Sequence, residues 1–125
     1  MRKRTNWFAL VTVVASIALG LSACAKPLPA ERAAYAGEWS GPGMILIIDA
    51  GGRMEYQRKS GSASKSIKSP IKEFQGDNFV VGIGSLTTTF IVSAPPHQVG
   101  DSWMMTVDGV ELTKQPPGTI PRDAD

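Results

Sequence analysis

A two-residue turn signal near the end of the chain constrains the fold more than any other feature. Asp108-Gly109 lies between two runs of alternating apolar residues, in the stretch WMMTVDGVELTK. A type I′ turn needs positive φ angles at both central residues, so this pair predicts a tight β-hairpin. The turn sorts the flanking side chains into an apolar and a mainly polar face, as a half-buried sheet requires. The predicted partners are Val107 with Val110, Thr106 with Glu111 and Met105 with Leu112.

Two more hairpins follow the same pattern of apolar runs and turn residues. The stretch MILIIDAGGRMEYQ closes at residues 49–52, which predicts core-facing pairs of Ile47 with Met54 and Ile45 with Tyr56. Another hairpin turns at residues 75–78 and joins IKEF to FVVGIG. A further strand, TTTFIV, is predicted to end at residues 94–96, which read Ala-Pro-Pro.

The number and spacing of these segments predict an all-β fold. With the segment around Trp39, the chain contains seven or eight short strands, arranged as an antiparallel meander. Closure into a barrel removes exposed sheet edges, whereas a sandwich only protects them. The local pairings favour an up-and-down order and therefore a small barrel, with a β-sandwich as the alternative. Most aromatic residues fall on predicted inner faces, although an aromatic-lined ligand mouth is the other interpretation.

The start of the chain has the layout of an export signal. Arg2, Lys3 and Arg4 precede a run from residue 7 to residue 21 that contains no charged residue. The next residues, Leu21-Ser22-Ala23-Cys24, closely resemble the lipobox of bacterial lipoproteins. This resemblance implies removal of residues 1–23 as a signal peptide, a diacylglycerol on the Cys24 thiol and a fatty-acyl group, such as palmitate, on the new amine.

The residue after the cysteine predicts the destination. Ala25 stands there instead of an aspartate, and by the sorting rule for such lipoproteins this implies the outer membrane, at its periplasmic face. Two alternatives remain open. Cys24, the single cysteine, can be a free thiol behind an ordinary signal peptide, or the apolar run can be an uncleaved anchor, since a spanning helix needs about 20 apolar residues.

The predicted mature chain, residues 24–125, is long enough for one domain. Without the three basic signal residues its formal charge is −1, so global charge gives no argument for nucleic acid. Residues 24–33, with two prolines, predict a lipidated tether followed by one helical turn, and residues 34–114 form the β domain. Residues 115–125 contain three prolines and no apolar period, which predicts a disordered tail.

Two resemblances concern the β domain. Gly37-Glu38-Trp39 resembles the Gly-X-Trp start of lipocalin-like barrels, in which the tryptophan plugs the closed end, and the whole chain is similar to small bacterial lipoproteins with a domain of unknown function. Such a barrel either encloses one small ligand or is filled by side chains. Ser60-Gly61-Ser62 and Thr113-Lys114 resemble two loop motifs of lipid-anchored inhibitors of c-type lysozyme.

Few residues point to catalysis or metal binding. His97 is the single histidine, and no known nucleophile motif surrounds it, so we expect an exposed loop residue. One histidine and a lipidated cysteine do not make a typical zinc site, and we expect neither a metal nor a cofactor. The aspartates at predicted turns are interpreted as structural: Asp49, Asp77, Asp101 and Asp108.

One basic segment suggests a partner surface. The stretch RKSGSASKSIK predicts a Ser-rich loop between strands, which is either simply solvated or contacts lipid headgroups or an acidic protein face. The candidate residues of this surface are Arg58, Lys59, Lys65, Lys68 and Lys72.

Together these features predict a non-enzymatic lipoprotein. It would be held at the membrane by its N-terminal lipid and would act as a binding or accessory module, with an envelope protein or a small apolar ligand as its partner. The alternatives are an inhibitor of a lysozyme-type enzyme and a carrier of a small lipid-like ligand.

Overall fold

The computed structural model describes residues 25–120 of the chain. One 3₁₀ helix, η1 (Ala30–Tyr35), precedes nine strands in this part. The strands are β1 (Gly37–Gly41), β2 (Met44–Ile48), β3 (Arg53–Ser60), β4 (Ala63–Gln75), β5 (Asn78–Ile83), β6 (Leu86–Phe90), β7 (Val92–Val99), β8 (Ser102–Val107) and β9 (Val110–Gln115). All nine form one antiparallel sheet in the order β6-β5-β4-β3-β2-β1-β9-β8-β7.

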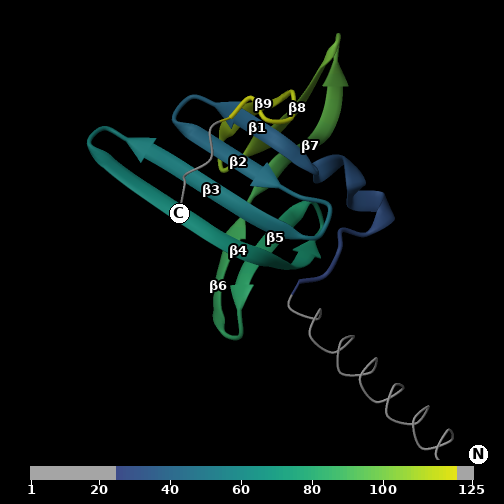
Figure 1. Cartoon of the computed structure of the whole chain (residues 1–125), viewed down its shortest axis with the longest axis vertical. Helices are drawn as coiled ribbons and strands as arrows, with labels where there is room; N and C mark the ends of the chain where they lie inside the picture. The colour runs from purple at the N-terminus through teal and green to yellow at the C-terminus, as the bar shows by residue number, and fades with distance from the viewer. Residues whose placement is uncertain (1–24, 121–125) are drawn as a thin grey trace, which may run out of the picture.

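The sheet is an antiparallel meander that curls into a half-barrel, with β6 and β7 as its edge strands (Figure 1). Strand β9 pairs with β1, and Ile91 is the one residue between β6 and β7 in the chain. The bend is held by Asp108, whose Oδ1 accepts the Ile91 N–H at 2.9 Å. Its own N–H donates to the Ile91 carbonyl at 2.8 Å. The predicted all-β, barrel-like meander is therefore confirmed.

The β8–β9 hairpin has the predicted register. Val107 pairs with Val110 and Met105 with Leu112, and Asp108 and Gly109 have φ angles of 48° and 79°. The β4–β5 hairpin is also confirmed, since Gln75 pairs with Asn78. At both turns the sequence contains the residue types that tolerate the required backbone angles.

The predicted register of the β2–β3 hairpin is wrong by one residue. Met54 pairs with Ile48, not with Ile47, and Tyr56 pairs with Leu46, not with Ile45. Gly52, at a φ of 91°, lets the chain turn through a short loop in which its N–H donates to the Asp49 carbonyl. A slip of one residue reverses the two faces of a strand, so Leu46 and Ile48 face the core.

Strand β7 corrects two predictions. The chain does not stop being a strand at residues 94–96, because β7 continues through both prolines to Val99, and the described strands number nine instead of seven or eight. Strand β7 is an edge of the sheet and its pairing with β8 is irregular around residues 92–97. Proline lacks the N–H that a central strand needs, so edges and bulges are where a strand tolerates it.

The interior of the curled sheet is filled by one cluster of buried side chains. Trp39 is fully buried, and its Nε1 donates to the carbonyl of Tyr35 at the end of η1 at 3.0 Å. Phe90 stacks on Phe79 with ring centroids 5.0 Å apart and meets Tyr56 edge to face at 4.9 Å. The remaining members come from seven strands: Met44, Leu46, Ile48, Met54, Ile71, Val81, Val92, Met105, Val107 and Leu112.

The end of the described chain packs on the outside of the sheet. The prediction of a disordered tail from residue 115 is wrong for residues 115–120, because Gln115 belongs to β9 and Ile120 is buried. Glu38 of β1 accepts the Gly118 N–H at 2.9 Å and the Ile120 N–H at 3.3 Å. These bonds satisfy a buried carboxylate and explain why a segment without apolar periodicity is ordered.

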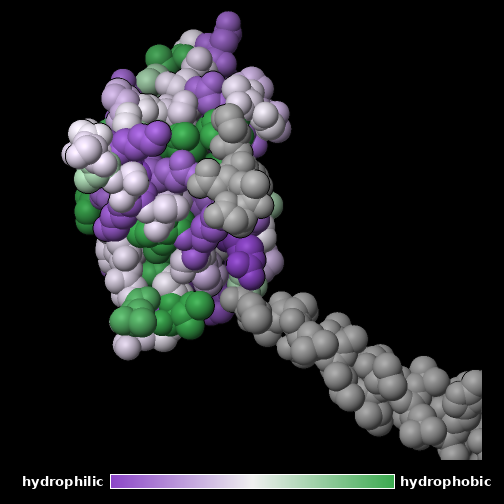
Figure 2. Space-filling model, turned by 60° about the vertical axis from the view of Figure 1, so that its left-hand side comes forward, coloured by the Kyte–Doolittle hydropathy of each residue, from purple (hydrophilic) through white to green (hydrophobic). Residues whose placement is uncertain are grey.

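Within residues 25–120, four large apolar side chains are exposed. Ile83 and Leu86, at 74% and 84% exposure, flank the two-residue turn between β5 and β6, while Ile91 and Val99 lie elsewhere. The β5–β6 turn is at the lower end of Figure 1. An apolar patch is visible at the same end of the surface (Figure 2).

Candidate functional site

The segment before η1 is packed against the sheet. The Leu28 N–H donates to the Ala50 carbonyl in the β2–β3 turn at 3.0 Å, and the Leu28 side chain packs on the core. The Lys26 carbonyl lies so close to Gly52 that no side chain fits there. The segment predicted to be an extended tether is thus packed against the sheet from Lys26 onward, and the helical turn after Pro29 is confirmed.

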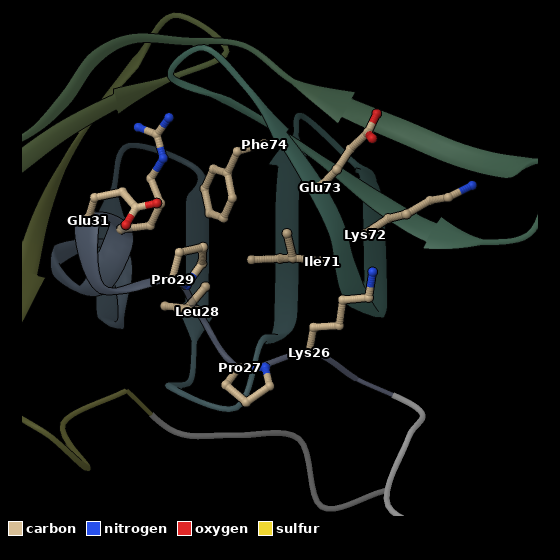
Figure 3. A pocket seen from close by; sticks show the side chains of 10 residues that line it. Lys26, Pro27, Leu28, Pro29, Glu31, Ile71, Lys72, Glu73 and Phe74 are labelled. Atoms are coloured by element: carbon tan, nitrogen blue, oxygen red, sulfur yellow. The ribbon is translucent and has the colours of Figure 1, made fainter.

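We call residues 25–29 the N-terminal strap. The strap, η1 and strand β4 line an open groove of about 370 Å³ (Figure 3). Its floor is apolar, formed by Leu28, Pro29, Ile71 and Phe74. Its rim is charged, formed by Lys26, Glu31, Arg32, Lys72 and Glu73. An apolar floor with a charged rim fits an amphiphilic molecule or surface better than a small polar substrate.

The arginine on the rim is a structural residue. The Arg32 Nη2 donates to the Gly76 carbonyl at 2.6 Å, and its Nη1 lies 3.6 Å from Oδ1 of Asp77. The guanidinium also stands over the Phe74 ring at 5.1 Å. These contacts hold η1 against the β4–β5 turn.

Tyr35 completes this connection. Its hydroxyl donates to the Asp77 carbonyl at 2.8 Å, and its ring meets Phe74 edge to face at 5.1 Å. Burial raises the pKa of Tyr35, the Arg32 charge opposes this increase, and the Asp77 charge adds to it. The phenol therefore stays protonated in the folded chain at neutral pH.

The Lys114 side chain is held against two tryptophans. Its Nζ lies 4.8 Å from the Trp39 ring centroid and 5.6 Å from that of Trp103, and it donates to the Ala34 carbonyl at 3.2 Å. Burial lowers the pKa of Lys114. Thr113-Lys114 is thus part of strand β9, not of a loop, which gives the lysozyme-inhibitor resemblance no support.

The basic segment is a projecting β-hairpin, not a loop. Strands β3 and β4 pair up to Ser60 and Ala63, and Gly61, at a φ of 64°, begins the two-residue turn (Figure 1). The prediction of a loop for this segment is therefore wrong, because its residues belong to two paired strands and a two-residue turn. The continuous pairing places the charged side chains alternately on the two faces of the hairpin.

The five predicted basic residues do not share one surface. Arg58 and Lys65 are cross-strand partners on the face that carries Tyr56, whereas Lys59 and Lys68 are on the opposite face. Lys72 lies farther along β4, at a bulge, and its Nζ donates to the Gly84 carbonyl at 2.7 Å. The basic residues therefore lie at three places: one on each face of the hairpin and one beside the β5–β6 turn.

His97 is an exposed residue of strand β7, so its predicted position in a loop is wrong. Its Nδ1 lies 2.9 Å from the Pro95 carbonyl oxygen. The structural role predicted for two turn aspartates is confirmed: Asp49 Oδ1 accepts the Arg53 N–H at 3.0 Å, and Asp108 holds the bend at Ile91. Within residues 25–120, no cluster of three or more His, Cys, Asp or Glu side chains is placed to hold a metal ion.

Cys24 and the predicted signal peptide, residues 1–23, are outside the described residues, as are residues 121–125 of the predicted tail. In the described part, no helix is long and apolar enough to cross a membrane. Comparison of the chain with protein-family models, with curated proteins and with solved structures found no match. The lipoprotein and lipocalin-like resemblances therefore remain predictions.

Sequence reasoning missed the residues at the N-terminal end of the domain. The sequence places Lys26 and Leu28 in a tether and Ile83 at the end of the strand FVVGIG, and it assigns Leu86 to no strand. Fold topology brings the strap to the β5–β6 turn, since Ala25, Lys26, Ile83 and Gly84 line one surface groove. The available signal was an apolar residue on each side of the Gly84-Ser85 turn, where polar residues are usual.

Proposed function

We propose that this chain is a lipid-anchored lipoprotein of the bacterial outer membrane, facing the periplasm, and that it acts as a non-enzymatic binding or accessory module. The observation that carries the anchor is the segment Leu21-Ser22-Ala23-Cys24 directly behind an uncharged run and three basic residues. Two or three acyl chains hold a protein firmly at a bilayer, whereas a single chain gives only marginal binding.

The filled interior supports a module that works through its outer surface. Fifteen buried side chains form one cluster inside the curled sheet, with Trp39, Phe79 and Phe90 at 0–1% exposure. A carrier of a small apolar ligand needs interior space that such packing occupies. We therefore favour surface contact with another envelope component over ligand transport.

The β3–β4 hairpin is the proposed contact site for an acidic partner protein. Arg58 and Lys65 face each other across the strands, and like charges in that position destabilise a sheet. Neither side chain has a hydrogen bond or ion pair to another side chain in the described part of the chain. A carboxylate-rich surface would relieve this repulsion and supply the missing partners.

The anchor is tested by two single substitutions and cell fractionation. Cys24→Ser removes the thiol that would carry the lipid, so the protein should leave the outer-membrane fraction. Ala25→Asp keeps the thiol and, by the sorting rule, should move the protein from the outer to the inner membrane. Retention of the Cys24→Ser variant in the outer membrane would contradict the proposed anchor.

The contact site is tested by photo-cross-linking in cells. A photoreactive amino acid in place of Ser62, at the hairpin turn, should give a discrete cross-linked product. This product should disappear in the Arg58→Glu/Lys65→Glu double variant. The same photoreactive residue in place of Ser102, at the start of β8, is the matched control. An unchanged product in the double variant would contradict an acidic partner at this site.

A further inference from the structure

One end of the domain combines exposed apolar side chains with lysines and with the start of the described chain. We call this the anchor-end surface and define it as Lys26, Lys72, Ile83 and Leu86. Ile83 and Leu86 project at 74% and 84% exposure on either side of the Gly84-Ser85 turn. In Figure 1 the β5–β6 turn and the start of the described chain lie toward the same low end of the molecule, and Figure 2 shows apolar surface at that end.

The two lysines lie beside this apolar tip. Lys72 Nζ donates to the Gly84 carbonyl at 2.7 Å, which holds its ammonium group directly at the turn. Lys26 lines the same surface groove as Ile83 and Gly84. A lysine ammonium has three donors, so Lys72 keeps two for an outside acceptor. Of the acids on the neighbouring groove rim, Glu73 accepts a hydrogen bond from Gln75 at 2.8 Å, and Glu31 belongs to η1.

The strap leaves very little free chain between the domain and Cys24. Lys26 and Leu28 are fixed against the β2–β3 turn, and Lys26 is only two residues from Cys24. An extended chain spans at most about 3.5 Å per residue, so two residues reach at most about 7 Å beyond Lys26. A lipid on Cys24 would therefore bring the anchor-end surface close to the bilayer.

We propose that the anchor-end surface is a bilayer-contact site: Ile83 and Leu86 insert into the interfacial region while Lys26 and Lys72 bind anionic phospholipid headgroups. This inference rests on the proposed lipid anchor and adds to it a fixed orientation. Apolar side chains on a projecting turn gain burial among acyl chains, and lysines beside them stay at the headgroup level. The protein would then be attached to the bilayer in two ways, by the lipid on Cys24 and by the anchor-end surface.

The orientation is tested on the full mature lipoprotein in vesicles of phosphatidylethanolamine and phosphatidylglycerol. Ser85→Cys and Ser102→Cys place one thiol at the β5–β6 turn or beside the β7–β8 turn, which is at the opposite end of Figure 1. Each thiol is labelled with a polarity-sensitive dye, and quenching by spin-labelled lipid chains is measured. We expect several-fold stronger quenching of the label at position 85 than of the label at position 102.

Further variants test each half of the surface. Ile83→Ser/Leu86→Ser should reduce quenching at position 85 to the level at position 102. Lys26→Gln/Lys72→Gln should reduce it several-fold, and so should replacement of phosphatidylglycerol by phosphatidylcholine. Equal quenching at positions 85 and 102 would overturn the proposal. A disulfide that joins two copies of the Ser85→Cys variant, without lipid quenching, would also overturn it, because the tip would then be an interface between the copies.

The same samples separate this inference from the anchor itself. The parent protein has only Cys24, which a thioether lipid blocks, so the parent should take up no dye. Dye on the parent would contradict the anchor. An unlabelled parent combined with an unquenched label at position 85 would contradict the bilayer contact alone.

Discussion

Gly52 shows how a single residue connects the strap to the sheet. Its φ of 91° lies where side chains are strained, and a Cβ there would overlap the Lys26 carbonyl oxygen. The residue thus allows both the β2–β3 turn and the close approach of the strap. Any side chain at this position must therefore displace either the β2–β3 turn or the strap.

We predict that Gly52→Ala lowers the free energy of unfolding by about 2–4 kcal/mol, because backbone strain and steric overlap add. Gly76→Ala is the matched control, since Gly76 also has a positive φ of 64° but no atom within 4 Å of the added Cβ. The control should lose only about 1 kcal/mol. Urea unfolding of the two variants checks this, and equal losses would contradict the close packing of the strap.

Tyr35 gives a prediction about pH. Its folded pKa is raised, mainly by burial, so its stabilising contribution is complete below the ordinary tyrosine pKa near 10 and is lost as pH rises through the raised value. Tyr35→Phe removes this dependence and the hydrogen bond to the Asp77 carbonyl, which contributes about 1 kcal/mol. The stability difference between parent and variant should therefore shrink above pH 10. A constant difference in urea unfolding between neutral and strongly alkaline pH would contradict this.

At the scale of elements, the sequence predicted two of the hairpins that have two-residue turns, β4–β5 and β8–β9, but the β3–β4 turn was interpreted as part of a loop. Asp108-Gly109 predicted its register correctly because both residues accept positive φ. The β2–β3 register was not foreseen, since the Asp49–Gly52 stretch is compatible with two loop lengths that differ by one residue. Local turn chemistry defines a register only where a single loop length fits.

The packing of the two ends of the domain on the sheet could not be predicted either, but the reason is different. The strap and the segment 116–120 contain prolines and no apolar period, and their contacts are distant in sequence. Gly118 and Ile120, for example, bond to Glu38, about 80 residues earlier. The same holds for the grouping of Lys26 with Ile83, which depends on the curl of the whole sheet.

The contact of segment 116–120 with β1 gives a prediction at this scale. Glu38→Ala removes both acceptors, so the amide protons of Gly118 and Ile120 should exchange with solvent at least about tenfold faster. Hydrogen bonds to a charged acceptor contribute about 1.5–3 kcal/mol, which is enough for this change. Glu111→Ala, on an exposed site of β9, is the control. Amide exchange followed by NMR checks the result, and unchanged protection would contradict the assigned anchoring.

For the molecule as a whole, the filled interior and the short strap have a joint consequence. The packed core supports the proposal that the domain acts through its outer surface, and the strap is fixed to the sheet from Lys26 onward. The β5–β6 turn would then face the bilayer. The β7–β8 turn, at the opposite end of the molecule in Figure 1, would extend into the periplasm.

The lipid at Cys24 determines both the proposed location of the protein and its proposed orientation at the bilayer. Mass spectrometry of the N-terminal peptide, isolated from the membrane fraction of cells that express the full chain, tests it directly. We predict a peptide that begins at Cys24 and carries a thioether-linked diacylglycerol together with an acylated amine. A peptide with a free Cys24 thiol, or one that still contains residues 1–23, would contradict the account.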